Sequence, residues 1–178
     1  VSVIFGDGAG AVVLTRSDHN GQGILSTHLH SEGKHALELS LKGPSTNHWV
    51  PEIIEENPQE DIPYYPYMNG QFVFKNAVVR FSEVIMEGLK ANGLDVKDID
   101  MLIPHQANLR ISQFIQQKFK LRDDQVYNNI QRYGNTTAAS IPIALTEAWE
   151  EGKIKEGDTI VLAAFGSGFT WTSAVIEW

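Results

Sequence analysis

The sequence contains no cysteine, and this absence excludes several kinds of site. Without thiols the chain has no disulfide scaffold, no zinc ribbon and no thiolate nucleophile. Proteins without disulfides are typical of reducing compartments, so we expect a cytoplasmic location. A reaction that needs a catalytic thiol would have to receive it from residues outside this chain.

Long apolar runs and an excess of positive charge are also missing. No apolar run approaches the roughly 20 residues that are needed to span a bilayer. The formal net charge is −8, which argues against non-specific binding to nucleic acid. With 42% hydrophobic and 20% charged residues, the composition is typical of a soluble globular protein. We therefore expect neither a membrane nor a nucleic acid as partner.

Polar residues are scarce at both ends of the chain. Residues 1–5 and 174–178 are mostly apolar and strand-like, although a natural domain usually begins and ends with polar surface residues. We therefore expect the chain to be a piece of a longer protein whose upstream part is missing.

Apolar spacing predicts three helices. Apolar residues recur every three or four positions in residues 71–92, where Asn92-Gly93 provides the stop, and again in residues 109–119. The third helix begins near Ser140, and one face of it carries four large or apolar residues, Ile141, Leu145, Ala148 and Trp149.

Short runs that are apolar, β-branched or alternating in polarity predict the strands. They are residues 1–5, 11–15, 24–30, 36–41, 100–103, 126–127, 159–165 and 169–176. The turn Gly166-Ser167-Gly168 joins the last two strands as a hairpin. Helices that alternate with strands and end in an antiparallel hairpin indicate an α/β fold, with a mixed sheet covered by helices on both faces.

Three further segments contain residues that are found in functional sites. The glycine-rich residues 6–10 lack the Lys-Ser/Thr and the following helix of a phosphate loop, so a bend between paired strands is favoured. His28, His30 and His35 have no carboxylate or thiolate at ligand spacing, which favours a solvated strand face over a metal site. The proline-rich residues 43–67 predict a long loop, a feature that is often functional.

His105 and Asn135 are the candidate catalytic residues. Each lies in a loop before a helix, and ligands of α/β sheets bind beyond the carboxyl ends of strands. A neutral imidazole and a carboxamide can both donate to one oxygen, and donors that converge on a developing negative charge form an oxyanion hole. The Gly166-Ser167-Gly168 turn could add a backbone N–H. From these residues alone, a structural histidine at a strand end stays open as the alternative for His105.

Four motifs that surround these residues occur in a fixed order. They are Phe5-Gly6-Asp7-Gly8-Ala9-Gly10-Ala11, Pro104-His105-Gln106-Ala107-Asn108-Leu109-Arg110, Tyr133-Gly134-Asn135-Thr136-Thr137-Ala138-Ala139-Ser140-Ile141-Pro142 and Ala164-Phe165-Gly166-Ser167-Gly168-Phe169-Thr170-Trp171. With Met68-Asn69-Gly70, they closely resemble the β-ketoacyl-[acyl-carrier-protein] synthase III family. The resemblance runs over essentially the whole chain and covers roughly the second half of such an enzyme.

The resemblance implies a thiolase-like fold, in which two similar α/β halves stack in five layers, usually as a homodimer. Residues 1–42 would be the terminal strands and linker of the N-terminal half, and residues 43–178 the C-terminal half. The implied enzyme is an acyltransferase that starts fatty-acid biosynthesis. An acyl group moves from coenzyme A to a catalytic cysteine and then condenses with malonyl on acyl carrier protein, with loss of carbon dioxide.

The family's catalytic cysteine belongs to the missing N-terminal half, so the resemblance implies that this piece alone is inactive. Coenzyme A and phosphopantetheine thioesters are substrates of the family, so neither a separate cofactor nor a metal is expected. His105 and Asn135 match the family's catalytic histidine and asparagine, which hold the thioester oxygen as malonyl becomes an enolate. Phe165 matches the phenylalanine beside that site, and with Gly166 and Ser167 it would form the active-site wall and oxyanion turn.

The remaining matched positions concern substrate access. Met68, Gly70, Ala107 and Asn108 match substrate-binding positions, the glycine and the asparagine in the pantetheine tunnel. Arg110 matches a basic residue that meets acidic carrier protein. Ser167 departs from the glycine that many relatives carry: its backbone amide is retained, but its Cβ could narrow the tunnel.

Two other functions stay open beside the fatty-acid initiator. One is a non-catalytic partner subunit of a condensing enzyme, and the retention of His105 and Asn135 argues against it. The other is a related enzyme, of the polyketide type, that condenses coenzyme A thioesters. The four motifs fit the initiator better.

Overall fold

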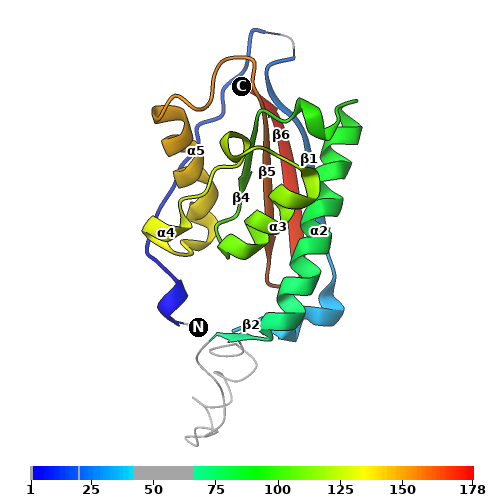
Figure 1. The fold of residues 1–178 in the computed structure, drawn as a ribbon, viewed down its shortest axis with the longest axis vertical. Helices are drawn as coiled ribbons and strands as arrows, with labels where there is room; N and C mark the ends of the chain where they lie inside the picture. The colour runs from blue at the N-terminus through cyan, green and yellow to red at the C-terminus, as the bar shows by residue number, and fades with distance from the viewer. Residues whose placement is uncertain (1, 20, 42–65) are drawn as a thin grey trace, which may run out of the picture.

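The computed structural model describes residues 2–19, 21–41 and 66–178 (Figure 1). Within these ranges the main sheet has the strand order β1-β6-β5-β4. Its strands are β1 (Gly23–Ser31), β4 (Met101–Pro104), β5 (Thr159–Gly166) and β6 (Thr170–Glu177). β4 and β5 are parallel, whereas β6 is antiparallel to both β5 and β1. The predicted mixed sheet and its closing hairpin are confirmed.

Helices cover both faces of this sheet. The long helices are α2 (Gly70–Ala91), α3 (Leu109–Phe119) and α5 (Ser140–Glu150). Leu102 of β4 joins the core formed with α2 and α3, while its neighbours Met101 and Ile103 join a second core with α5. Successive residues of a strand face opposite sides. β4 is therefore buried on both faces, and the residue that follows it has a rigid support.

Shorter elements connect these parts. They are η1 (Ser2–Ile4), η2 (Gly33–Glu38), β2 (Leu39–Ser40), β3 (Tyr67–Met68), η3 (Val96–Asp98), η4 (Asp123–Gln125), α4 (Ile130–Tyr133) and η5 (Thr137–Ala139). β2 and β3 pair as a small separate sheet. None of the helices in the described ranges is long and apolar enough to cross a membrane.

The helix boundaries follow local capping chemistry. The Asn69 side chain accepts a hydrogen bond from the Phe72 amide at the start of α2, and Asn92 closes its end. Asn108 caps α3 by accepting from the Arg110 amide at 2.9 Å. Such caps satisfy amides that have no partner inside a helix. The predicted helices 71–92 and 109–119 are confirmed to within a residue or so.

The two strands predicted around residues 6–10 are wrong. Residues 2–4 form a 3₁₀ turn, Phe5 makes a single bridge with Asn135, and residues 11–15 form no strand. Val13 is 86% exposed, and no strand pairs with this β-branched run among the described residues. A β-branched sequence favours extended backbone, but a strand also needs a partner to pair with.

Other local predictions need correction. Residues 33–38, where part of a strand was predicted, form a 3₁₀ helix, and Val126 makes only one bridge, with Leu102. On α5, Trp149 is 56% exposed instead of packing with Ala148. Most of the predicted loop 43–67 lies outside the described residues. So does the predicted domain boundary between residues 42 and 43, which stays a prediction; β1, from the first predicted part, pairs with β6 of the second.

Candidate active site

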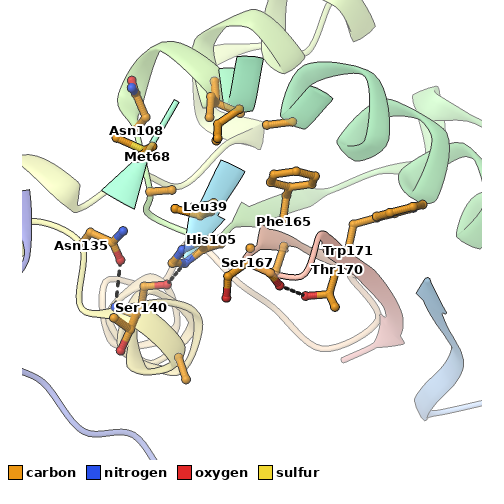
Figure 2. Close-up of a pocket in the computed structure, with 18 of the residues that line it drawn as sticks. Leu39, Met68, His105, Asn108, Asn135, Ser140, Phe165, Ser167, Thr170 and Trp171 are labelled. Carbon is orange, nitrogen blue, oxygen red and sulfur yellow. Dashed lines mark hydrogen bonds between the residues drawn. The ribbon is translucent and has the colours of Figure 1, made fainter. Parts of the chain in front are cut away.

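A cavity of about 620 Å³ opens at the carboxyl ends of the parallel strands β4 and β5 (Figure 2). Apolar side chains from α2, β1, β2 and α3 form much of its wall, among them Leu29, Leu39, Val73, Phe74, Phe81 and Ile111. The predicted site residues His105, Asn135, Phe165, Gly166, Ser167, Met68, Gly70, Ala107 and Asn108 all line it. An apolar cavity with a few convergent polar groups is the usual form of a small-molecule site.

His105 directly follows β4, and its backbone N–H donates to the Ala163 carbonyl of β5 at 2.8 Å. Its ring Nδ1 lies 2.6 Å from the Ser140 hydroxyl at the start of α5. Burial lowers the pKa of His105 from its ordinary value of 6.5 to about 4. The imidazole is therefore neutral at physiological pH, as a hydrogen-bond donor to an oxyanion must be if it is not to surrender a proton.

Asn135 is held on both its backbone and its side chain. Its N–H donates to the Ile4 carbonyl at 2.8 Å, and its own carbonyl accepts from the Gly6 N–H at 3.0 Å. The Oδ1 atom accepts from the Thr137 N–H at 2.9 Å, and since a backbone amide only donates, this contact fixes which atom is oxygen. The amide nitrogen is left as the atom that can donate to a bound substrate.

The segment around Gly6 therefore braces the asparagine. A Cβ at Gly6 would lie 2.0 Å from the Tyr133 carbonyl oxygen, so no other residue fits without movement of the backbone. The predicted strands of this region are absent, but its glycines have a clear role: they allow close approach to the loop that carries Asn135.

Gln106 ties the loop of His105 to the segment that leads to Asn135. It is 3% exposed. Its side-chain nitrogen donates to the Pro104 carbonyl at 2.7 Å and to the Tyr127 carbonyl at 3.3 Å. Its side-chain oxygen accepts from the Asn129 and Ile130 amides at 3.0 and 3.1 Å. One buried carboxamide thus fixes the relative position of the two loops.

Phe165 is an apolar residue of the same cavity wall. It is 5% exposed and meets Phe169 edge to face, with 4.9 Å between ring centroids. Figure 2 shows His105, Asn135 and Ser140 close together on one side of the cavity. The arrangement offers two neutral donors beside apolar carbon, which suits an oxygen that gains negative charge during a reaction.

Comparison with known proteins now decides the family. The C-terminal model of 3-oxoacyl-[acyl-carrier-protein] synthase III matches residues 89–178, and the companion model of 3-oxoacyl-[acyl-carrier-protein] synthase III matches residues 1–33. The chain belongs to the 3-oxoacyl-[acyl-carrier-protein] synthase III family. The resemblance read from the four motifs is confirmed.

Individual relatives agree with this assignment. The chain is 46% identical over 180 residues to the β-ketoacyl-[acyl-carrier-protein] synthase III of Rhodospirillum centenum, covering 99% of this chain and 52% of that protein. Its structure is similar to that of the synthase III of Aquifex aeolicus, with a TM-score of 0.79 and 36% identity over 92% of this chain and 47% of that one. The synthase III of Thermus thermophilus gives a TM-score of 0.79 and 38% identity, covering 90% and 47%. The fold is thiolase-like, and the chain spans about half the length of these relatives.

Three of the remaining candidate residues line the cavity, and the fourth, Arg110, lies outside it. Gly166 is half-buried and Ser167 exposed, and the Ser167 carbonyl accepts from the Thr170 hydroxyl at 2.9 Å. Asn108 is exposed and uses its Oδ1 to cap α3. Arg110 is exposed on the first turn of α3 and does not line the cavity, as expected of a residue that would meet a partner rather than a substrate. The roles assigned to these residues stay predictions.

Ser140 is the contact residue whose role the sequence did not reveal. It is 2% exposed and contacts the His105 ring, yet its position in the Asn135 motif gave no sign of that contact. The only available signal was a hydroxyl residue at the predicted start of a helix, close in sequence to a catalytic candidate.

The histidines of β1 pair with a carboxylate that their spacing did not indicate. Glu87 of α2 lies 2.6 Å from His30 Nε2 and 3.4 Å from His28 Nδ1. The predicted solvated strand face is therefore wrong for His28, which is half-buried between strand and helix. Within the described ranges, no cluster of three or more histidine, cysteine or acidic residues could hold a metal ion.

Proposed function

We propose that this chain is the C-terminal catalytic half of a decarboxylating condensing enzyme that starts fatty-acid biosynthesis. The observation that carries the proposal is the pairing of two neutral donors, His105 and Asn135, in an apolar cavity of a synthase III fold. The relatives that the chain matches are named as β-ketoacyl-[acyl-carrier-protein] synthases III. The chain has no cysteine, so the acylated thiol would come from the other half of the protein.

The proposed reaction uses these donors at one step. The bond between the methylene carbon and the carboxylate of malonyl thioester breaks, carbon dioxide leaves, and the electron pair forms a thioester enolate. The enolate oxygen accepts hydrogen bonds from His105 and Asn135, which stabilise the negative charge where it develops. The enolate carbon then attacks the acyl-cysteine carbonyl, a new carbon–carbon bond forms, and the cysteine leaves as thiolate.

The apolar surroundings favour this step. Phe165 gives the carboxylate an apolar neighbour, which disfavours the charged group relative to neutral carbon dioxide. A His105 whose pKa lies far below neutrality does not carry a positive charge that would hold the carboxylate in place. The apolar neighbour and the neutral imidazole both favour loss of the carboxylate as carbon dioxide.

The partners belong to the proposal as well. Acyl-coenzyme A would supply the acyl group, and malonyl would arrive on acyl carrier protein, guided by Arg110 on the exposed start of α3. The phosphopantetheine arm would enter past Met68, Gly70, Ala107 and Asn108. We also propose a homodimer in the cytoplasm, as for an enzyme of this family without disulfides.

The test is to complete the chain with the N-terminal half of a family member and to separate the two half-reactions. His105→Ala and Asn135→Ala should each lower malonyl decarboxylation by at least about 100-fold, because each removes one donor to the enolate oxygen. Transfer of the acyl group to cysteine should stay measurable in both variants. His19→Ala, which alters an exposed histidine away from the cavity, is the matched control.

The two alternatives give different results. A non-catalytic partner subunit would show no decarboxylation even without a substitution. An enzyme specific for coenzyme A thioesters would use malonyl-coenzyme A at least as well as malonyl-carrier protein, whereas the proposed enzyme prefers malonyl-carrier protein. Equal loss of both half-reactions in His105→Ala would contradict the assigned role. The 178-residue chain alone should show no condensation.

A further inference from the structure

The Ser140 hydroxyl is the one polar side-chain group that contacts the His105 ring in the described part of the chain. Its Oγ lies 2.6 Å from His105 Nδ1 and 3.3 Å from the backbone nitrogen of Gln106. Ser140 is 2% exposed, and its own N–H donates to the Thr137 carbonyl. The hydroxyl is therefore fixed in place and shielded from water.

Counting hydrogens shows which way these bonds run. A serine hydroxyl has one hydrogen to donate and can accept twice. The Gln106 amide can only donate, so the Ser140 oxygen accepts that bond. The hydroxyl hydrogen then needs an acceptor, and His105 Nδ1 is the acceptor at hydrogen-bond distance among the described residues.

The opposite arrangement leaves a group unpaired. If His105 carried its hydrogen on Nδ1 and donated to Ser140, the hydroxyl hydrogen would be buried without an acceptor in the described ranges. Buried polar groups without partners are rare because they lose their bonds to water. The lone pair on Nδ1 is therefore the better match for the serine, which places the ring hydrogen on Nε2.

We infer that Ser140 is a positioning residue that holds His105 in the tautomer with hydrogen on Nε2, so that Nε2–H is the bond offered to the substrate oxygen. This inference rests on the proposed function for its chemical meaning, but the tautomer itself is a property of the protein. Nε2 has no bonding partner among the described residues, and the ring lines the cavity. A histidine nitrogen gains its role from the bond that the other nitrogen makes.

Gln106 makes the arrangement rigid. Its backbone amide, which donates to Ser140, belongs to the residue whose side chain is tied to the Pro104 and Tyr127 carbonyls. The serine hydroxyl thus meets a donor that cannot rotate away, and its own hydrogen is directed toward the imidazole.

The experiment is nitrogen NMR of ¹⁵N-histidine-labelled, completed synthase, combined with malonyl decarboxylation kinetics. In the parent protein, Nδ1 of His105 should show the shift of an unprotonated nitrogen and Nε2 that of a protonated one. Ser140→Ala should mix the two tautomers and lower kcat by about 10- to 100-fold, because the other tautomer cannot donate from Nε2, while KM changes little. Ser140→Thr, which keeps the hydroxyl, should restore the parent pattern.

Ser112→Ala is the matched control, because Ser112 is a buried serine of α3 whose hydroxyl has no partner in the described residues. It should leave both the tautomer and kcat unchanged. A parent spectrum with hydrogen on Nδ1, or a Ser140→Ala protein with unchanged tautomer and kcat, would overturn the inference. If Ser140→Ala fails to fold, the parent and Ser140→Thr spectra still decide it. If the parent shows no decarboxylation, the proposed function fails, and the spectra still report on the tautomer.

Discussion

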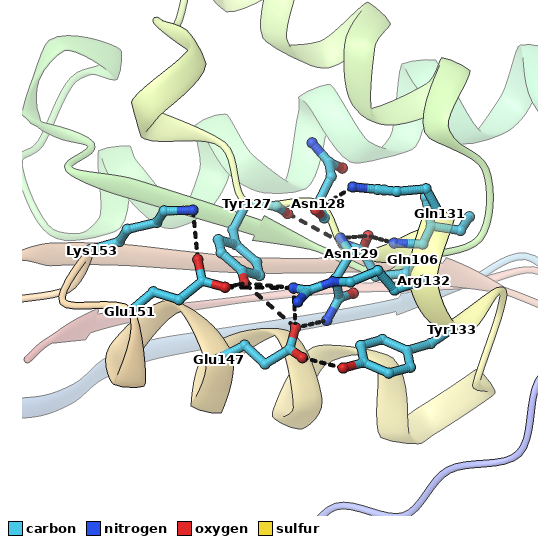
Figure 3. A network of polar contacts seen from close by, with 11 residues as sticks. Gln106, Tyr127, Asn128, Asn129, Gln131, Arg132, Tyr133, Glu147, Glu151 and Lys153 are labelled. Atoms are coloured by element: carbon cyan, nitrogen blue, oxygen red, sulfur yellow. Dashed lines mark hydrogen bonds and ion pairs between the residues drawn. The ribbon is translucent and has the colours of Figure 1, made fainter.

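Helix α5 contacts two polar regions that differ in how far their side chains are hydrogen-bonded. At its start, Ser140 meets His105 beside a cavity in which His105 Nε2 and the Asn135 amide nitrogen point to no protein partner among the described residues. Further along, Glu147 accepts hydrogen bonds from Asn129 at 2.8 Å, from Arg132 at 2.6 Å and from the Tyr133 hydroxyl, while the Tyr127 hydroxyl donates to Glu151 at 2.9 Å (Figure 3). We call this second region, made of Tyr127, Asn129, Arg132, Tyr133, Glu147, Glu151 and Lys153, the Glu147 network.

Charge is handled differently in the two regions. Although burial raises the pKa of Glu147, the hydrogen bonds from Asn129 and Tyr133 and the charge of Arg132 lower it below its ordinary value of 4.5. At the cavity, burial acts on His105 without a compensating charge and keeps it neutral. Several donors hold Glu147 in the network, whereas the described residues offer no hydrogen-bond partner to His105 Nε2 or to the Asn135 amide nitrogen.

The largest loss of stability should follow from Gln106→Ala, because this substitution removes the hydrogen bonds that link the two regions. It leaves the Asn129 and Ile130 amides and two carbonyls without their partner, and each unpaired buried group costs roughly 1–3 kcal/mol. We expect a loss of about 4 kcal/mol in the free energy of unfolding, measured in urea. Gln131→Ala, an exposed glutamine four residues from Tyr127, should cost less than about 0.5 kcal/mol. Similar losses of stability in both variants would contradict the role of Gln106 in holding the His105 loop to the segment 127–130.

The next effect is a pH dependence that belongs to the cavity. The folded-state pKa of His105 is about 4 and its ordinary value is 6.5, so the unfolded chain binds more protons in between. The stability contribution is complete above pH 6.5 and is lost as pH falls toward 4, a change of about 3 kcal/mol. Urea unfolding from pH 7 to pH 4 should show this loss, and His105→Asn, which does not titrate, should show a correspondingly flatter curve. If the stability of the parent and of His105→Asn fell in parallel with pH, His105 would not be the group responsible.

Glu147→Ala should affect stability more than chemistry. It removes the acceptor of several bonds from the 127–133 segment, but Arg132 is 45% exposed and can turn to water, so we expect a loss of about 2 kcal/mol. Glu150→Ala changes an exposed glutamate of the same helix and is the control. In completed enzyme below its unfolding temperature, malonyl decarboxylation by Glu147→Ala should stay within about threefold of the parent, in contrast to a cavity variant. A loss as large as that of Asn135→Ala would mean that the two regions are not separable.

The smallest effect concerns the surface. Arg110→Glu should raise KM for malonyl-carrier protein about tenfold at low salt and leave a free malonyl pantetheine thioester nearly unchanged, since a surface charge mainly steers encounter. Arg122→Glu, at another exposed position paired with Asp124, serves as the control. If Arg110→Glu raised KM equally for both substrates, Arg110 would not belong to a docking surface.

The sequence predicted those elements whose signal is local. The periodic apolar residues of α2 and α3 and the glycine turn between β5 and β6 determine structure within a few residues, so these predictions hold. Residues 11–15 have an equally clear strand composition, but a strand needs a neighbour to pair with, and no described strand pairs with this run. A composition signal cannot supply a partner.

The same division applies to the site. His105 and Asn135 were predicted because their positions before helices and their motifs are local, and the structure brings both to one cavity. Ser140 contacts His105 across 35 positions, and Glu87 contacts His30 across 57, so neither contact is visible as spacing. The candidate catalytic residues could be predicted from the sequence, whereas the residues that contact and orient them became visible only in the fold.

The Gly6 contact gives this chain an unusual genetic signature. Gly6 is not among the residues proposed to bind the thioester. Any side chain at this position would nevertheless press on the Tyr133 carbonyl and shift the loop that carries Asn135. If the proposed function holds, mutants at position 6 should therefore behave like mutants of Asn135, which keep substrate binding and lose malonyl decarboxylation. A suppressor screen starting from such a mutant should return substitutions in residues 133–136 that let the Tyr133 backbone move away from position 6.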